Sequence, residues 1–195
     1  MSNDTKQRMI ESAADLLRMK GPSAMSFTDV TAGSGAPRGV IYHHFPGGKL
    51  ELVRDAVEWT GNTVLDQLNA IPADSAIALV DRFLGAIRGL LRESSDGASC
   101  AVAAVTIESS ADDGPLTSTA DAAFRSWINA LRDRFVAFGV ARSTALDLAT
   151  MLIVVLQGSH VLARASGGLS HFDRTARVTR TAAAALLGVG GSATH

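Results

Sequence analysis

Residues 37–53, PRGVIYHHFPGGKLELV, hold the densest group of side chains that could do chemistry in this chain. Arg38, Tyr42, His43 and His44 precede a Pro-Gly-Gly turn that leads to Lys49. Residues of these types suit three kinds of site: a catalytic or metal site built on the histidines, a phosphate-binding loop built on the glycines and the lysine, or a surface that recognises a polyanion.

Spacing argues against the first two. A phosphate-binding loop needs a glycine five residues before its second glycine and Ser or Thr after the lysine, but His43 and Leu50 stand there. Adjacent residues on a helix point about 100° apart, so His43 and His44 are poorly placed to share one ion, and Cys, Asp and Glu are missing at ligand spacing. We expect one of the two histidines to face the helix junction and the other solvent or phosphate. The sequence predicts no metal site and no cofactor.

Other polar residues also fail to indicate catalysis. His160 lies in an apolar helical pattern, where a buried core histidine is more common than a catalytic one. The Asp112-Asp113 pair stands in a glycine-containing loop, as turn chemistry favours. A nucleophile elbow and a paired-acid motif are both absent from the sequence. We therefore expect no catalytic residues and predict that the protein is not an enzyme.

The elements that flank this stretch fit the third kind of site, a surface that recognises a polyanion, better than a catalytic or phosphate-binding site. Ser26 and Asp29 resemble a capping box at the start of a helix over about 27–33, and the GSGA turn at 33–36 leads to Pro37, which suits the first position of a helix to about residue 44. Two short helices joined by a tight glycine turn form a helix-turn-helix. Such a second helix can lie in a major groove, and Lys49, beside the start of the next helix, suits a backbone phosphate.

The remaining elements are predicted helices. Residues 3–5 can cap a first helix that ends at Gly21-Pro22. The stretch CAVAAVTIE at 100–108 also suits a strand, but a lone strand would have no partner, so we interpret it as a helix. Further helical patterns run from Lys49 to before Pro72, over 77–91, through 124–138, from a cap at Ser143 through His160, and over about 172–187, with breaks at 94–97 and 109–115. The chain is predicted to be all-α, with about nine helices.

Length and composition bound the class of protein. The chain has 195 residues, of which 47% are hydrophobic and 19% charged, enough apolar content for one folded core. A single cysteine, the absence of an apolar leader, and an apolar run at 148–156 that is shorter than the roughly 20 residues of a membrane span indicate the cytoplasm and no membrane. Residues 1–54 carry seven Lys and Arg against five Asp and Glu, whereas the rest carries 11 against 14. This asymmetry weakly favours an anion-binding head.

The first 55 residues or so resemble the DNA-binding domain of TetR-type bacterial repressors. The resemblance rests on a capped helix, a turn glycine and a helix that ends in Tyr-x-His-Phe before a lysine, in SFTDVTAGSGAPRGVIYHHFPGGKLEL. The extra glycine before the lysine is similar to the subgroup typified by the LmrA and YxaF repressors. SCAVAAVTIE is similar to a segment of the same subgroup, which would make Cys100 and Glu108 features of its regulatory domain.

The resemblance implies a helix-turn-helix DNA-binding domain at 1–48, a ligand-binding and dimerisation domain at 49–188 and a flexible tail at 189–195. It implies a homodimer, paired through its last two long helices, that binds a near-palindromic double-stranded operator and is released when a small lipophilic effector shifts the fourth helix. We expect Arg38 and Gly39 to face bases and Tyr42, His43 and Lys49 to face phosphate, with Thr28 as a further DNA contact. The predicted effector-binding residues are Phe83, Ile87, Cys100, Phe124, Trp127, Met151, Val155 and His160.

Two alternatives stay open. The chain would be a helical small-molecule carrier or enzyme with a vestigial DNA-binding head if its DNA binding were blind to sequence. An activator of the same family would share every motif with a repressor.

Overall fold

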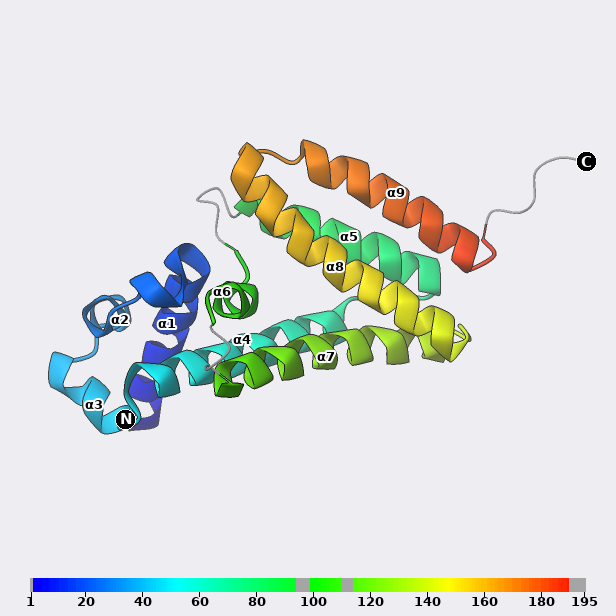
Figure 1. The fold of residues 1–195 in the computed structure, drawn as a ribbon. Coiled ribbons are helices and arrows are strands. Elements are labelled where there is room, and N and C mark those ends of the chain that lie inside the picture. The colour runs from blue at the N-terminus through cyan, green and yellow to red at the C-terminus, as the bar shows by residue number, and fades with distance from the viewer. Residues whose placement is uncertain (1, 94–98, 110–113, 190–195) are drawn as a thin grey trace, which may run out of the picture. The chain divides into compact units, whose positions relative to one another are not determined.

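A computed structural model describes residues 2–93, 99–109 and 114–189 (Figure 1). Within these ranges the chain forms nine α-helices and one short 3₁₀ helix, η1, and contains no strand, so the all-α prediction is confirmed. The predicted break at 94–97, most of the predicted loop at 109–115 and all but the first residue of the predicted tail lie outside the described residues. The helices are α1 Ser2–Ala24, α2 Phe27–Ser34, η1 Arg38–Val40, α3 Ile41–His44, α4 Gly48–Ala70, α5 Ala76–Glu93, α6 Ala101–Glu108, α7 Gly114–Ala137, α8 Arg142–Ser166 and α9 Ser170–Leu186.

The chain divides into two compact units. The first comprises Met1–Val64 and Ala98–Phe124, and the second comprises Leu65–Gly97 and Arg125–His195, so both α4 and α7 contribute to each unit. The predicted functional division at residue 48 stays a prediction.

The first unit is built around α1, which packs against α2 and α6. The buried side chains of α1 are Met9, Ala13, Ala14 and Leu17, and their spacing of three and four residues places them on one helical face. The predicted helix at 100–108 is confirmed as α6, which buries Ala101, Val102 and Val105. Later in this unit, Gly61 of α4 packs closely against Ala123 of α7, since a Cβ at Gly61 would lie 3.0 Å from the Ala123 methyl.

The second unit packs α5, α8 and α9 together. Two ion pairs join α5 to α9: Arg88 to Asp173 at 3.0 Å and Arg180 to Asp81 at 2.7 Å. Arg134 of α7 donates hydrogen bonds to the carbonyls of Leu68 and Ile71 and so caps the end of α4. Partial burial lowers the pKa of this guanidinium from its ordinary value.

Helix boundaries differ from the predictions at four points. α7 begins at Gly114, so the end of the predicted loop at 109–115 is helical and the helix starts before the predicted pattern at 124–138. α1 continues to Ala24 across a kink at Gly21, where φ is 76° and ψ is 170°, so the predicted end appears as a break within the helix. Pro37 is the cap residue before η1 rather than the first helical residue, because its ψ of 136° is extended. α8 begins at Arg142 after Ala141, and its cap residue makes no side-chain hydrogen bond, so Ser143 is not the cap.

By length and composition alone, α8 would suffice to cross a membrane, because the helix extends well beyond its apolar run at 148–156. Its most apolar 18-residue window is 44% buried inside the structure. Leu148, Leu152 and Ile153 are among its buried residues, as in the central helix of a folded unit.

Candidate nucleic-acid interface and regulatory domain

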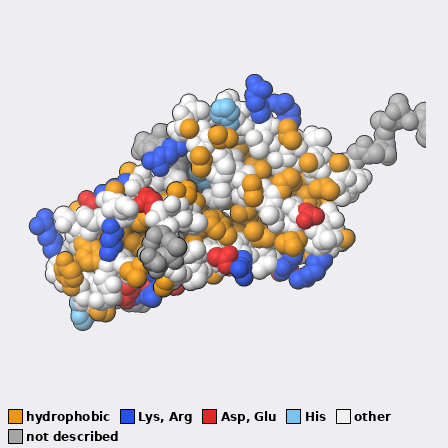
Figure 2. All heavy atoms as spheres, in the orientation of Figure 1, with side chains coloured by type: hydrophobic (Ala, Val, Ile, Leu, Met, Phe, Trp, Pro, Cys, Tyr) orange, Lys and Arg blue, Asp and Glu red, His pale blue; other side chains and the backbone are white. Residues whose placement is uncertain are grey.

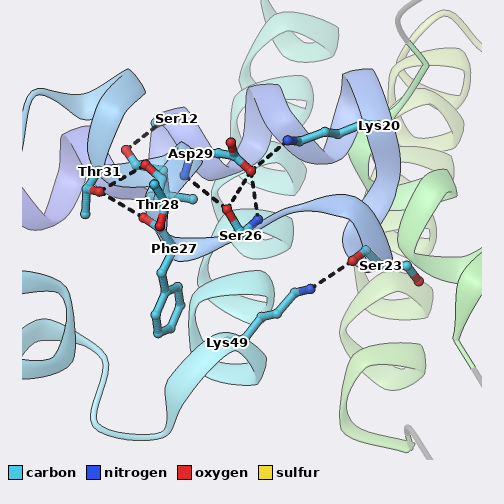
Figure 3. A network of polar contacts seen from close by, with 10 residues as sticks. Ser12, Lys20, Ser23, Ser26, Phe27, Thr28, Asp29, Thr31 and Lys49 are labelled. Atoms are coloured by element: carbon cyan, nitrogen blue, oxygen red, sulfur yellow. Dashed lines mark hydrogen bonds and ion pairs between the residues drawn. The ribbon is translucent and has the colours of Figure 1, made fainter. Parts of the chain in front are cut away.

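The start of α2 is fixed by a complete capping box. The Ser26 hydroxyl accepts a hydrogen bond from the Asp29 N–H at 3.2 Å, and the Asp29 carboxylate accepts one from the Ser26 N–H at 3.1 Å. Lys20 of α1 reaches the same carboxylate at 2.7 Å (Figure 3). Hydrogen bonds from Lys20 first, and then from Ser26, lower the pKa of Asp29 from 3.8 to about 2. The box predicted from the sequence is therefore present, and it orients α2 against α1.

Buried residues at the two ends of α3 hold that helix in place: Ile41 is its first residue and Phe45 follows its last. Ile41 is 1% exposed and Phe45 is fully buried. The Lys6 ammonium lies 5.2 Å from the centroid of the Phe45 ring and also pairs with Asp55 of α4 at 3.0 Å. Contacts that involve α1 and α4 thus fix the direction in which α3 projects its outer face.

The outer face of this region carries all six predicted DNA contacts. Each of them is exposed to solvent: Thr28, Arg38, Gly39, Tyr42, His43 and Lys49. Tyr42 is 67% exposed and packs edge to face on Phe27, with ring centroids 5.4 Å apart. His43 is exposed, whereas His44 is half-buried.

Gly39 is open to solvent. A Cβ built at this position meets no described atom within 4 Å, and the backbone is outside the left-handed region. The fold therefore does not require glycine here, in contrast to Gly48, whose φ of 73° turns the chain into α4. A glycine that the fold does not need suits a surface that another molecule approaches closely.

Lys49 has a partner in this structure. Its ammonium donates a hydrogen bond to the Ser23 carbonyl at 3.3 Å (Figure 3). The preceding turn is held by Glu51, whose carboxylate accepts a hydrogen bond from the Gly47 N–H at 2.8 Å. Lys49 therefore lies at the start of α4 on the exposed surface, within reach of both the end of α1 and an external anion.

The predicted effector-binding residues are divided between the two units. Cys100 and Phe124 belong to the first unit, and the other six belong to the second. Trp127 is fully buried and Phe83, Ile87, Val155 and His160 are nearly so, whereas Met151, Cys100 and Phe124 are partly exposed. Their joint assignment to one pocket stays a prediction.

The sequence reasoning overlooked Gln157. Both polar atoms of its side-chain amide are buried, and neither has a hydrogen-bond partner within the described part of the chain. Gln157 is three residues before His160, so the two lie on the same face of α8. A glutamine directly after the apolar run at 148–156 is the signal that would have found it, because a buried amide without a partner is costly.

The second unit also has a surface hollow of about 430 Å³ near the start of α5 and the turn after α7. Residues that line it include Ile77, Phe138 and Leu186, and none of the predicted effector-binding residues. This hollow is open and lies at a different part of α8 from Gln157.

Exposed apolar side chains follow one stripe on each of α8 and α9. On α8, Val154 is 65% exposed and Val161 58%; on α9, Val178 is 66% exposed and Leu186 53%. The intervals of seven and eight residues place each pair on a single helical face. Figure 2 shows hydrophobic side chains gathered on the visible surface over these helices.

Comparison with known proteins gives concordant matches over nearly the whole chain. Residues 9–56 match the family described as bacterial regulatory proteins, tetR family, and residues 76–178 match the LmrA/YxaF-like transcriptional regulator C-terminal domain. An HTH-type transcriptional regulator of Mycobacterium tuberculosis is 34% identical over 180 residues, which cover 90% of this chain and 92% of the relative. The HTH-type transcriptional regulator LmrA of Bacillus subtilis is 26% identical over 82% of this chain and 86% of its own length.

Solved structures with the same fold include two TetR regulators. The regulator from Agrobacterium tumefaciens superposes with a TM-score of 0.79 at 21% identity, covering 93% of this chain and 98% of that one. The regulator from Legionella pneumophila gives a TM-score of 0.77 at 22% identity, covering 91% and 96%. At these identities the likeness concerns the fold.

Proposed function

The chain belongs to the TetR family of bacterial transcriptional regulators, in its LmrA/YxaF-like branch, and from this premise we propose that it is a repressor released from its operator by a small lipophilic effector. Regulators of this family bind DNA and act as dimers. The observation that best supports a working DNA-binding head is the exposure of all six predicted contacts, which lie on α2, η1, α3 and the start of α4, while the buried Ile41 and Phe45 anchor α3.

We assign base recognition to Arg38 and Gly39 and backbone contacts to Thr28, Tyr42, His43 and Lys49. Within the described ranges Arg38 makes no ion pair, so its guanidinium is available for a base edge or a phosphate. Bidentate contacts from arginine to guanine are the commonest specific contacts in a major groove. The ammonium of Lys49 has three donors, so it can bind a phosphate while it keeps its exposed hydrogen bond to the Ser23 carbonyl.

The stripe of exposed valines and leucines on α8 and α9 is the proposed dimer interface. Side chains such as Val154 and Val178 are costly to leave in water, and two copies of this face would form a four-helix bundle. Substitution of Val178 by Glu should shift the protein to a monomer in multi-angle light scattering. Gln67→Glu, which adds the same charge at an exposed position of α4, should not. A dimer that survives Val178→Glu would refute this interface.

Gln157 supports an effector site inside the second unit. We propose that its unsatisfied amide, together with His160 on the same face of α8, bonds the polar group of an otherwise lipophilic effector. The buried side chains of Phe83, Ile87, Trp127 and Val155 would supply the apolar surroundings. We further propose that the protein catalyses no reaction and works in the cytoplasm, where its operator is.

DNA-binding variants test the proposed function. The duplex would be recovered from random DNA by repeated selection on the wild-type dimer and then used in anisotropy titrations at two salt concentrations. Tyr42→Ala and Lys49→Ala should weaken binding to all duplexes, and Lys49→Ala should reduce the salt slope by about one. Arg38→Ala should also reduce the difference in affinity between the selected duplex and a random duplex. Arg82→Ala, an exposed cation on α5, is the control and should bind as the wild type does.

Unchanged affinity in both Tyr42→Ala and Lys49→Ala would refute the assigned contacts. A wild type that binds random and selected duplexes equally would instead favour the carrier or enzyme with a vestigial head, because charge alone gives binding that is blind to sequence. Transcription from the recovered operator, measured with and without the protein, separates a repressor from an activator.

A further inference from the structure

The end of α1 is held by groups from outside that helix. The Arg18 carbonyl accepts hydrogen bonds from the N–H of Ser99 at 2.9 Å and from its hydroxyl at 3.3 Å. The Ser23 N–H donates to the carboxylate of Glu108 at 3.0 Å, and the Ser23 carbonyl accepts from Lys49. Backbone groups at a helix end need such partners, and here α4 and the segment around α6 supply them.

Glu108 fits a space that only glycine leaves. Gly21 is buried at the kink of α1, and a Cβ built on it would lie 1.9 Å from one carboxylate oxygen of Glu108 and 2.9 Å from its Cδ. The positive φ of Gly21 independently favours glycine. The kink and the carboxylate therefore occupy one site. The kink exposes the Ser23 N–H, and because Gly21 has no side chain, the Glu108 carboxylate can reach this N–H and accept its hydrogen bond.

This contact joins the two parts of the chain that the family comparison separates. Gly21 and Ser23 lie within residues 9–56, which match the DNA-binding family, and Glu108 lies within residues 76–178, which match the C-terminal domain. α6 buries Ala101, Val102 and Val105 in the first unit, and Glu108 is its last residue. A displacement of α6 would withdraw the carboxylate from α1.

We propose that Glu108 is a positioning residue through which the C-terminal domain holds the DNA-binding head. Ser23 carries the connection, because its N–H bonds Glu108 of α6 and its carbonyl bonds Lys49 at the start of α4. With Glu108 in place, the end of α1 and the start of α4 are ordered before DNA arrives, which lowers the entropy lost on binding. With Glu108 withdrawn, both are released together. This inference rests on the proposed DNA-binding function.

Hydrogen exchange and operator affinity, measured on the full-length dimer, test the proposal. Glu108→Ala should speed amide exchange in the peptide that spans residues 19–26 and weaken binding to the selected duplex by about three- to tenfold, in line with the loss of one hydrogen bond. Glu108→Gln, which keeps a neutral acceptor of the same length, should fall between this variant and the wild type. Ile107→Ala is the matched control, because Ile107 is the preceding residue of α6 and is 75% exposed.

A double-mutant cycle separates the proposed contact from general damage to the helix. Gly21→Ala should weaken DNA binding, partly through its φ and partly by displacing the Glu108 carboxylate. In the Glu108→Ala background the second part is already lost, so Gly21→Ala should weaken binding by a smaller factor than in the wild type. If Glu108→Ala does not fold, Glu108→Gln replaces it in both measurements.

Three results would overturn the inference: unchanged exchange in residues 19–26, faster exchange with unchanged or tighter operator binding, or equal effects of Gly21→Ala in both backgrounds. Failure of the proposed function looks different. In that case the wild-type protein itself would show no preference for the selected duplex. If only this inference fails, the wild-type protein still prefers the selected duplex, and Glu108→Ala binds that duplex as tightly as the wild type does.

Discussion

Replacing Gly39 by Ala should strengthen the fold and weaken DNA binding at the same time. The backbone at Gly39 is outside the left-handed region, and a Cβ there meets no atom of the described ranges within 4 Å. The added methyl group is thus free of strain and of clashes within the protein. It would, however, project from the first turn before α3, where we place contacts with base edges.

The two effects differ in sign and can be estimated separately. Gly to Ala at a compatible site stabilises a fold by about 0.4 to 1 kcal/mol, mainly by restricting the unfolded chain. A methyl group forced into a well-packed contact costs about 1 to 3 kcal/mol. Since 1.4 kcal/mol is a factor of ten, the affinity for the selected duplex should fall by about 5- to 150-fold.

Urea unfolding and anisotropy titration on the same preparations would measure both quantities. Gly85→Ala is the matched control, because a Cβ on this exposed glycine of α5 also meets no described atom within 4 Å. It should stabilise the fold by about 1 kcal/mol or less and leave DNA binding unchanged. Undiminished operator affinity in Gly39→Ala, or an equal loss in Gly85→Ala, would refute the placement of Gly39 against DNA.

Three further predictions concern stability. Gln157→Leu should raise the free energy of unfolding by about 1 to 3 kcal/mol, because it removes a buried amide without a partner. Gln67→Leu, the same change at an exposed site, should leave the free energy of unfolding within about 0.5 kcal/mol of wild type. A Gln157→Leu variant less stable than wild type would show that the amide is satisfied. Asp29→Asn should destabilise the protein at pH 7. Because the pKa of Asp29 is about 2 in the folded state and its ordinary value is 3.8, the difference in unfolding free energy from wild type should be complete above about pH 4 and shrink as the pH falls towards 2. A difference independent of pH would contradict this. Arg134→Met should lower the free energy of unfolding, measured in urea, by about 1.5 to 3 kcal/mol, since it removes two hydrogen bonds at the end of α4. Arg132→Met, which removes only local surface contacts, should lower it by less than about 1 kcal/mol. Equal losses of stability in the two variants would count against the cap.

Local signals predicted most of the fold. Ser26 and Asp29 specify the start of α2 through their own hydrogen bonds, and Gly21-Pro22 marks the break in α1, so both are readable from adjacent residues. The helix over 100–108 required one global argument, that a lone strand would have no partner. The exposed face of α3 followed from the same local pattern, because its few large apolar residues leave the other side chains to solvent.

Contacts between residues distant in sequence were not predictable in this way. The approach of Glu108 to Ser23 and Gly21 joins residues 85 or more positions apart, and the cap that Arg134 places on α4 spans more than 60. Each depends on how helices pack, which periodicity does not determine. The end of α1 at Ala24 shows the same limit, because the kinked turn persists with partners from α4 and α6.

The most direct test of the central claim is the ratio of affinities for the selected operator duplex and a random duplex of equal length, measured for the wild-type dimer at physiological salt. A sequence-specific regulator should prefer the operator by at least about 10³-fold, with one dimer bound to each near-palindromic site. A ratio near one, with both affinities falling together as salt rises, would contradict the claim.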